Sequence, residues 1–319
     1  MATRPNISVW ALLVAVLALA VLDLAFGGVR LNLGEFFSQD GTLQRQIVFN
    51  IRLPRVLCAV LSGAALSLAG CQMQAVFRNP LADPHILGLS SGSALGAALA
   101  IGLGALSVAG GAFIGACLAS VCIVAVSSRF KGVTVLLIFG VLLGFVFSAV
   151  TTLCQYFSSE ESLKLYHSWV SGSFSASGWD GVTYIALALL LGLFLALSNL
   201  KGLDIILFGE DFALAGGAPI GLIRIKAILS CCIMTAVVTA FCGPIGFVGI
   251  IGPHLARALT GKAAHRWIVF PSILIGGGLA LIADAMSQVF SVPVPAGATM
   301  ALAGVPVIMY IILGKRLWF

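Results

Sequence analysis

Apolar runs long enough to cross a lipid bilayer recur along the whole of this 319-residue chain. A transmembrane helix needs about 20 consecutive apolar residues. Only 9% of the residues are charged and 60% are hydrophobic, so the chain is too apolar for a water-soluble protein. We therefore predict an all-α polytopic membrane protein, with one transmembrane domain over residues 1–319. The expected spans are 8–27, 52–75, 86–105, 108–128, 133–157, 181–199, 224–243, 246–260, 267–289 and 299–314.

Two of these ten runs have unusual features. The first follows Arg4 as a signal peptide would, but its small-residue triplet, 18–20, lies inside the run. We therefore expect an uncleaved transmembrane helix. The eighth run, 246–260, is short and rich in glycine, which predicts a broken or partly re-entrant helix.

The distribution of positive charge predicts which loops face the cytoplasm. An even number of spans places both termini on one side. If that side is the cytoplasm, 12 of the 17 lysines and arginines are cytoplasmic, as the positive-inside rule requires. We therefore predict cytoplasmic termini. The net charge of +6 follows from this bias and does not indicate a nucleic-acid partner.

One polar stretch, residues 201–219 (KGLDIILFGEDFALAGGAP), interrupts the apolar sequence between the sixth and seventh runs. Its acidic residues are mixed with apolar ones, and glycines divide it. This pattern predicts one or two short amphipathic helices that lie on a surface. The charge bias places the stretch in the cytoplasm, where we expect another protein to contact it.

Small residues are concentrated inside the predicted spans, for example at 62–65, 88–96 and 276–278. Lipid provides no hydrophobic force between helices, and small residues let their backbones approach closely. We therefore predict a tightly packed bundle. The eight cysteines lie in or at the ends of apolar runs without CxxC spacing, so we interpret them as small buried side chains.

Few polar residues in the spans suggest chemistry. Asp284 lies within the ninth run and should face the bundle interior, either as a hydrogen-bonded group or as a proton relay. His254 and Arg257 share a helix face, and we assign His254 to packing or capping. The sequence has no phosphate-binding loop, metal-ligand cluster or nucleophile elbow. We therefore expect no catalytic residue, metal site or cofactor in this chain.

Several short motifs occur in order along nearly the whole chain, and together they resemble the FecCD/BtuC-type permeases of ABC importers. That family carries ferric siderophores, haem or cobalamin across the bacterial inner (cytoplasmic) membrane. The motifs are RLPR at 52–55, GAALSLAG at 63–70, MQA at 73–75, NPLADP at 79–84, LG at 87–88, WVSGSF at 169–174, GE at 209–210 with Ala213, GPI at 243–245, FVG at 247–249, PH at 253–254 with Arg257, AD at 283–284 and PAG at 295–297.

The resemblance implies roles for residues in three places. Arg52 and Arg55 match the family's docking pair for glutamates on a substrate-binding protein, whereas Gln288 stands where a further docking arginine is common. Asn79 and Leu81 match the cytoplasmic gate, and spans five and ten would line the pathway. The residues of the cytoplasmic coupling segment, 201–219, that would couple to the ATPase are Leu207, Gly209, Glu210, Phe212, Ala213 and Gly216.

The function that the resemblance implies is that of a permease subunit of an ATP-driven importer with type II architecture. By alternating access it would carry a ferric siderophore or related iron chelate. Haem and cobalamin (vitamin B12) are the alternative cargoes, and an ion-gradient-driven secondary transporter is the alternative mechanism. The implied partners are a second copy of the permease or a paralogous one, two cytoplasmic ABC ATPases that bind ATP and Mg, a periplasmic or lipid-anchored binding protein, and membrane lipid.

Overall fold

The computed structural model of the chain describes residues 8–25, 42–104, 106–130, 132–175, 177–288 and 294–313, and within these ranges it contains helices and no strand. The elements are α1 (Val9–Ala25), α3 (Thr42–Ile47), the π-helix η1 (Val48–Arg52), α4 (Leu53–Phe77), the 3₁₀-helix η2 (Pro84–Leu87), α5 (Leu89–Leu103), α6 (Val108–Arg129), α7 (Val133–Tyr156), α8 (Glu160–Val170), α9 (Gly178–Leu197), α10 (Leu200–Leu207), α11 (Glu210–Ala215), α12 (Ile220–Cys242), α13 (Val248–Thr260), α14 (His265–Ser287) and α15 (Ala296–Leu313).

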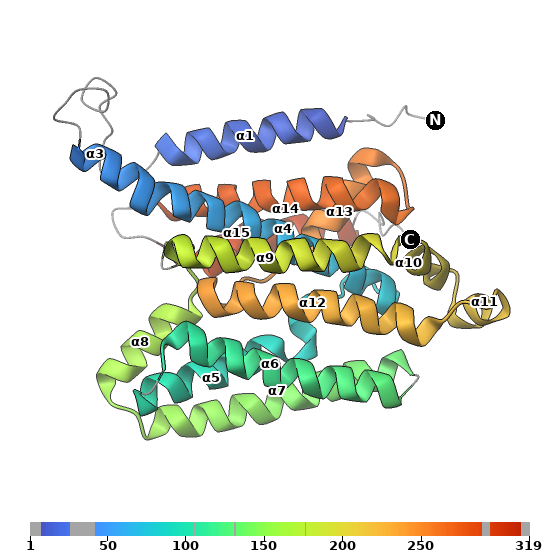
Figure 1. The fold of residues 1–319 in the computed structure, drawn as a ribbon, viewed down its shortest axis with the longest axis horizontal. Coiled ribbons are helices and arrows are strands. Elements are labelled where there is room, and N and C mark those ends of the chain that lie inside the picture. The colour runs from blue at the N-terminus through green and yellow to red at the C-terminus, as the bar shows by residue number, and fades with distance from the viewer. Residues whose placement is uncertain are drawn as a thin grey trace.

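The long helices run side by side in one bundle (Figure 1). Helix α4 is the most enclosed of them and packs against α9, α12, α13 and α14. The short helices α10 and α11 lie at one end of the bundle, and α3 and α8 lie at the opposite end (Figure 1). Every site described below belongs to one of these two ends or to a groove that runs between them.

Each predicted span overlaps a helix of the structure, so the all-α prediction is confirmed. In the described ranges six helical stretches are long and apolar enough to cross a membrane, and three shorter apolar helices accompany them. The count of ten crossings and the cytoplasmic position of both termini stay predictions. Helix α13, which corresponds to the eighth run, has 13 residues with Pro253 inside it.

The helices α3 and α8 and all but the last residue of η1 lie outside both the predicted spans and the coupling segment, and local capping explains why α8 forms. Helix α3 continues through η1 into α4, so the second span begins earlier than its apolar pattern indicates. Helix α8 begins after Ser159, whose hydroxyl accepts a hydrogen bond from the backbone N–H of Ser162. Glu160 and Glu161 occupy its first turn, where negative charge favours the positive end of the helix dipole.

Glycine allows α4 to touch its neighbours backbone to backbone. A Cβ atom at Gly63 would overlap the carbonyl oxygen of Gly276 in α14, and one at Gly70 would overlap the carbonyl oxygen of Gly249 in α13. Such close approach strengthens van der Waals packing between helices in lipid. The prediction of a bundle packed through small residues is therefore confirmed at these crossings.

The cysteines agree with their interpretation as small apolar side chains. All eight are free, and five of them are buried. Those five are Cys58, Cys71, Cys231, Cys232 and Cys242.

Gly70→Ala should destabilise the protein by about 1–3 kcal/mol, because the new methyl group must displace backbone of α13. The measurement is the unfolding free energy of the purified chain in detergent. Gly102→Ala is the matched control, since nothing lies within 4 Å of a Cβ at that position in α5. It should leave the stability unchanged or raise it by up to about 1 kcal/mol. Equal effects of the two substitutions would contradict this account of the packing.

Candidate functional site

The coupling segment, residues 201–219, forms the two short helices α10 and α11, as its amphipathic pattern predicts. Gly209 separates them with a φ of 110°, a conformation that L side chains rarely adopt. The segment extends from the bundle at the end opposite α3 and α8 (Figure 1). Its role in coupling stays a prediction. Its two short helices protrude from the end of the bundle.

One face of the coupling segment is fixed to the bundle. Ala213 is fully buried in a small apolar cluster with Ile206 and Ile223. Glu210 makes an ion pair with Arg224 of α12, with a distance of 2.8 Å between Oε1 and the guanidinium nitrogen. Leu207 packs partly buried against the main core. Displacement of α11 would therefore be transmitted to α12.

A second attachment joins α10 to α14. The Asp204 carboxylate accepts hydrogen bonds from the backbone N–H of His265, at 2.8 Å, and from its ring Nδ1, at 2.6 Å. Partial burial by itself would raise the pKa of Asp204, but the hydrogen bonds from His265 outweigh burial and hold that pKa below its ordinary value. Asp204 thus stays ionised and anchors the base of the segment.

The opposite face of the coupling segment is apolar and exposed. Phe208, Phe212 and Leu214 are 75%, 62% and 62% exposed. The two phenylalanine rings lie 5.6 Å apart between centroids. Gly216 is also exposed, at the end of α11. An exposed aromatic pair on a rigid support is typical of a surface that contacts a protein partner.

The proposed gate residues lie in the loop of residues 78–88, at the carboxyl end of α4. The side-chain oxygen of Asn79 accepts a hydrogen bond from the backbone N–H of Leu81 at 2.9 Å, so these two residues form one Asx turn. His254 of α13 donates from Nε2 to the carbonyl oxygen of Pro80 at 2.9 Å. This bond supports the structural role predicted for His254.

Further bonds tie the same loop to the region around α13. His85 donates from Nε2 to the carbonyl oxygen of Ile245 at 2.9 Å, and its other ring nitrogen contacts the hydroxyl of Ser90. Just before the loop, Gln74 accepts a hydrogen bond from Arg257 at 2.5 Å and donates to the carbonyl oxygen of Gly249. The 78–88 loop and α13 are therefore positioned together.

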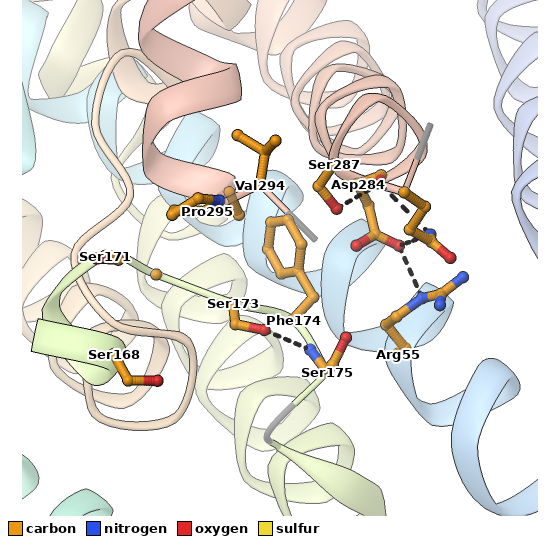
Figure 2. A pocket seen from close by; sticks show the side chains of 13 residues that line it. Arg55, Ser168, Ser171, Ser173, Phe174, Ser175, Asp284, Ser287, Val294 and Pro295 are labelled. Atoms are coloured by element: carbon orange, nitrogen blue, oxygen red, sulfur yellow. Dashed lines mark hydrogen bonds and ion pairs between the residues drawn. The ribbon is translucent and has the colours of Figure 1, made fainter. Parts of the chain in front are cut away.

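Arg52 and Arg55 lie at the opposite end of the bundle, and both are buried, at 3% and 8% exposure. The guanidinium of Arg52 donates to the carbonyl oxygens of Leu24 and Ala25, at 2.9 and 3.1 Å, and so caps the carboxyl end of α1. Arg55 makes an ion pair with Asp284 at 2.9 Å (Figure 2). Their docking role stays a prediction, and within the chain Arg52 already contacts α1 and Arg55 already pairs with Asp284.

Asp284 faces the bundle interior as predicted, at 2% exposure, and a second carboxylate, Asp23 of α1, lies beside it. The Gln288 amide donates to Asp23 at 3.3 Å and to Asp284 at 3.2 Å, and Asp23 lies 4.0 Å from the Arg55 guanidinium. Sequence reasoning missed Asp23 because it stands at the end of an apolar run. Two signals were available in the sequence: the acidic Asp23 at the end of an apolar run, and Arg55, for which no partner within the chain had been predicted.

A cavity of about 430 Å³ opens next to this cluster. Arg55, Asp284 and Gln288 form one wall, while the turn that follows α8 and the beginning of α15 supply serines, Phe174 and Pro295 (Figure 2). Figure 2 shows the Arg55–Asp284 pair directed into this region beside Ser287. Arg55 and Asp284 therefore border a cavity as well as the interior of the bundle.

A second groove, of about 350 Å³, runs along α7 between α5 and α8. Four of its polar side chains are spaced i, i+3, i+4 and i+7 on α7, so they share one helix face. Sequence reasoning overlooked this stripe, although its spacing is visible in the sequence. The four residues are Ser148, Thr151, Thr152 and Gln155.

The sequence profile of the FecCD transport family matches residues 13–314. The chain belongs to this family. It is 33% identical to the vitamin B12 import system permease BtuC of Shigella boydii, over 98% of this chain and 97% of that protein. It is 35% identical to the uncharacterized ABC transporter permease YvrB of Bacillus subtilis, over 89% of this chain and 83% of that protein.

A solved structure gives the same result for the fold. It shows an inward-facing conformation of a transporter assigned to the metal-chelate type of ABC transporters. The TM-score is 0.87 at 32% identity, and the match covers 97% of this chain and 99% of that one. The resemblance to FecCD/BtuC-type permeases is thereby confirmed. In ABC importers of this kind the permease acts with a separate ATPase subunit and a substrate-binding protein.

The buried ion pair in this FecCD-family chain should be strongly coupled. Arg55→Met alone should lower the unfolding free energy by about 3–5 kcal/mol, because it leaves buried carboxyl groups without their cation. Asp284→Leu alone should cost less, because Asp23 still lies 4.0 Å from the Arg55 guanidinium. The double substitution should be less destabilising than the sum of the two single changes. Unfolding of the four purified proteins in detergent measures the cycle, and additive effects would show that the two side chains do not interact.

Proposed function

We propose that this chain is the permease subunit of an ATP-driven importer of a metal chelate in the bacterial inner membrane. In this proposal two copies, each with ten spans and cytoplasmic termini, enclose one pathway in the type II arrangement. The observation that carries the proposal is the coupling segment, with Phe208 and Phe212 exposed on helices that are fixed to the bundle. Membership of the FecCD family supports the assignment of an ATPase as the partner of that surface.

ATP hydrolysis belongs, in this proposal, to two partner subunits that bind ATP and Mg, and the permease holds no cofactor. Closure of the ATPase dimer moves α11, and Glu210 passes the movement to α12 through Arg224. Asp204 passes it to α14 through His265. Both contacts are short and partly or fully buried, so a displacement moves the bundle and is not absorbed by a flexible tether.

The 78–88 loop is the cytoplasmic gate in this mechanism, with Asn79 and Leu81 at its narrow point. His254 holds Pro80, so the loop follows α13 when the bundle changes conformation. Alternating access requires two defined positions of such an element. The hydrogen bonds to α13 support one defined position in the conformation described here.

The pathway runs along α7 and α15. The hydroxyl and amide groups of the α7 stripe supply polar contacts, and most of the remaining large side chains of α7 are apolar and exposed in the single chain. Exposed residues such as Leu142, Phe145 and Leu153 are available to the second copy and to lipid.

Docking of the binding protein takes place at the Arg55 cavity. Carboxylates of that protein would compete with Asp284 and Asp23 for the Arg55 guanidinium. The opening of the cavity beside Arg55 and Gln288 supports this route. Arg52 contributes by holding α1 against the same end of the bundle.

The cargo is a ferric siderophore, a haem or cobalamin. The relative BtuC is named as a permease of a vitamin B12 import system, and the similar solved structure is assigned to the metal-chelate type of ABC transporters. The decisive experiment reconstitutes the permease in liposomes with its ATPase and binding protein, and measures uptake of radiolabelled cobalamin, haem and ferric siderophore. One of the three should accumulate only when ATP is present. Uptake that needs an ion gradient but no ATP would contradict the proposal.

Glu210→Arg should uncouple transport from ATP hydrolysis in the same liposomes. It replaces an attraction to Arg224 by repulsion, so transport should fall at least fivefold while ATP hydrolysis continues. Unchanged transport would refute the role of this ion pair.

The charge swap Glu210→Arg with Arg224→Glu is the matched control for this experiment. It restores an ion pair with the opposite polarity and should recover part of the lost transport. If the swap transports no better than Glu210→Arg alone, the loss arises from the ATPase contact and not from the link to α12.

A further inference from the structure

Two cavities on the outer wall of the bundle, away from the pathway and the docking cavity, share one face of α12. The first, of about 290 Å³, lies among the ends of α9 and α10, the loop before α12 and the first turns of α12. The second, of about 380 Å³, lies between α6, α9 and α12 further along the bundle. Figure 1 shows α9 and α12 running side by side from the coupling end.

A single stripe of α12 connects the two cavities. Leu222 and Lys226 line the first, and Leu229, Ile233 and Val237 line the second. The spacing of i, i+4, i+7, i+11 and i+15 places all five on one helix face. From Lys226 to Val237 the stripe extends about 16 Å at 1.5 Å per residue. The two cavities therefore open on the same face of α12, and we refer to them together as the groove.

The two parts of this groove differ in chemistry. The cavity between α6, α9 and α12 forms an apolar channel, lined by exposed side chains that include Tyr184, Leu187 and Leu191 of α9. The cavity beside the coupling segment forms the mouth of the groove and carries two lysines, Lys201 of α10 and Lys226 of α12. Among the described residues no carboxylate makes an ion pair with either lysine. The groove thus combines a cationic mouth with an apolar channel, as the two ends of a phospholipid require.

We propose that this groove binds one anionic phospholipid, with its phosphate between Lys201 and Lys226 and an acyl chain between α9 and α12. The positive mouth matches the headgroup, and the apolar channel has the length of most of an acyl chain. The proposed orientation puts the mouth in the cytoplasmic leaflet, where anionic lipid is recognised by basic pockets between helices. The choice of leaflet rests on the proposed function, whereas lipid binding in the groove is independent of the cargo.

The location gives this lipid a consequence for coupling. Gly216, Ala218 and Pro219, which end the coupling segment, line the same mouth as the two lysines. A bound headgroup would contact α10, the loop after α11 and α12 at once. The lipid would therefore restrict the coupling segment relative to α12, next to the Glu210–Arg224 contact.

Native mass spectrometry of the full, delipidated chain in detergent tests the proposal, with phosphatidylglycerol and phosphatidylcholine in competition. The wild type should retain phosphatidylglycerol with a preference of roughly tenfold or more. Lys201→Gln with Lys226→Gln should remove that preference. The matched control, Lys262→Gln with Arg266→Gln, removes two charges beside Trp267, one before α14 and one in its first turn, and should keep the preference. An unchanged preference in the first variant would overturn the proposal.

Two further arms test the acyl chain and the source of the phosphate. Leu191→Trp should obstruct the channel and reduce retention of both lipids, whereas Leu190→Trp, an exposed neighbour on α9 outside the groove, should not. Glycerophosphoglycerol, which has the headgroup without acyl chains, should not displace the lipid at equal concentration. Displacement would identify a simple anion site and refute a lipid occupant. The assay needs neither ATPase nor cargo, so a failed import experiment would leave its result interpretable.

Discussion

The close approach of glycine backbones along α4 is the constraint on which the rest of the structure depends. At Gly63 and Gly70 no side chain larger than hydrogen fits against α14 and α13. In a bilayer, helices gain little from hiding apolar surface from one another, so contact at van der Waals distance must hold them together. Because α4 crosses the whole bundle in this way, a displacement of α13 or α14 moves the centre of the molecule.

The buried polar contacts act on that rigid centre from its two ends. At one end Arg55 and Asp284 join α4 to α14, with Asp23 bringing in α1. At the other end His265, the first residue of α14, binds Asp204 of the coupling segment. Helix α14 therefore carries a polar anchor at each end and a glycine contact in the middle. In the proposed function one end contacts an ATPase and the other a binding protein, so α14 would connect the two contact surfaces.

The sequence predicts much of this architecture because the signals are local. Apolar runs locate the helices, and the mixture of acidic and apolar residues around Gly209 predicts the two short helices of the coupling segment. The motifs around Arg55 and Asn79 indicate the family. What the sequence does not reveal is which polar residues meet across helices. Asp23 and Asp284 are 261 positions apart in the chain, and their pairing depends on the crossing of α1 and α14.

Two of the hydrogen bonds that hold the 78–88 loop end on backbone carbonyl oxygens, which every residue possesses. His254 and His85 bind the backbone carbonyl oxygens of Pro80 and Ile245, and not side chains that evolution could alter. Substitutions of the loop's own exposed side chains leave these acceptors in place. In the proposed function a cargo meets this loop, so its exposed side chains could change while the backbone contacts to Pro80 and Ile245 keep the loop in position. Adaptation to a new cargo would then be separate from the contacts that position the loop.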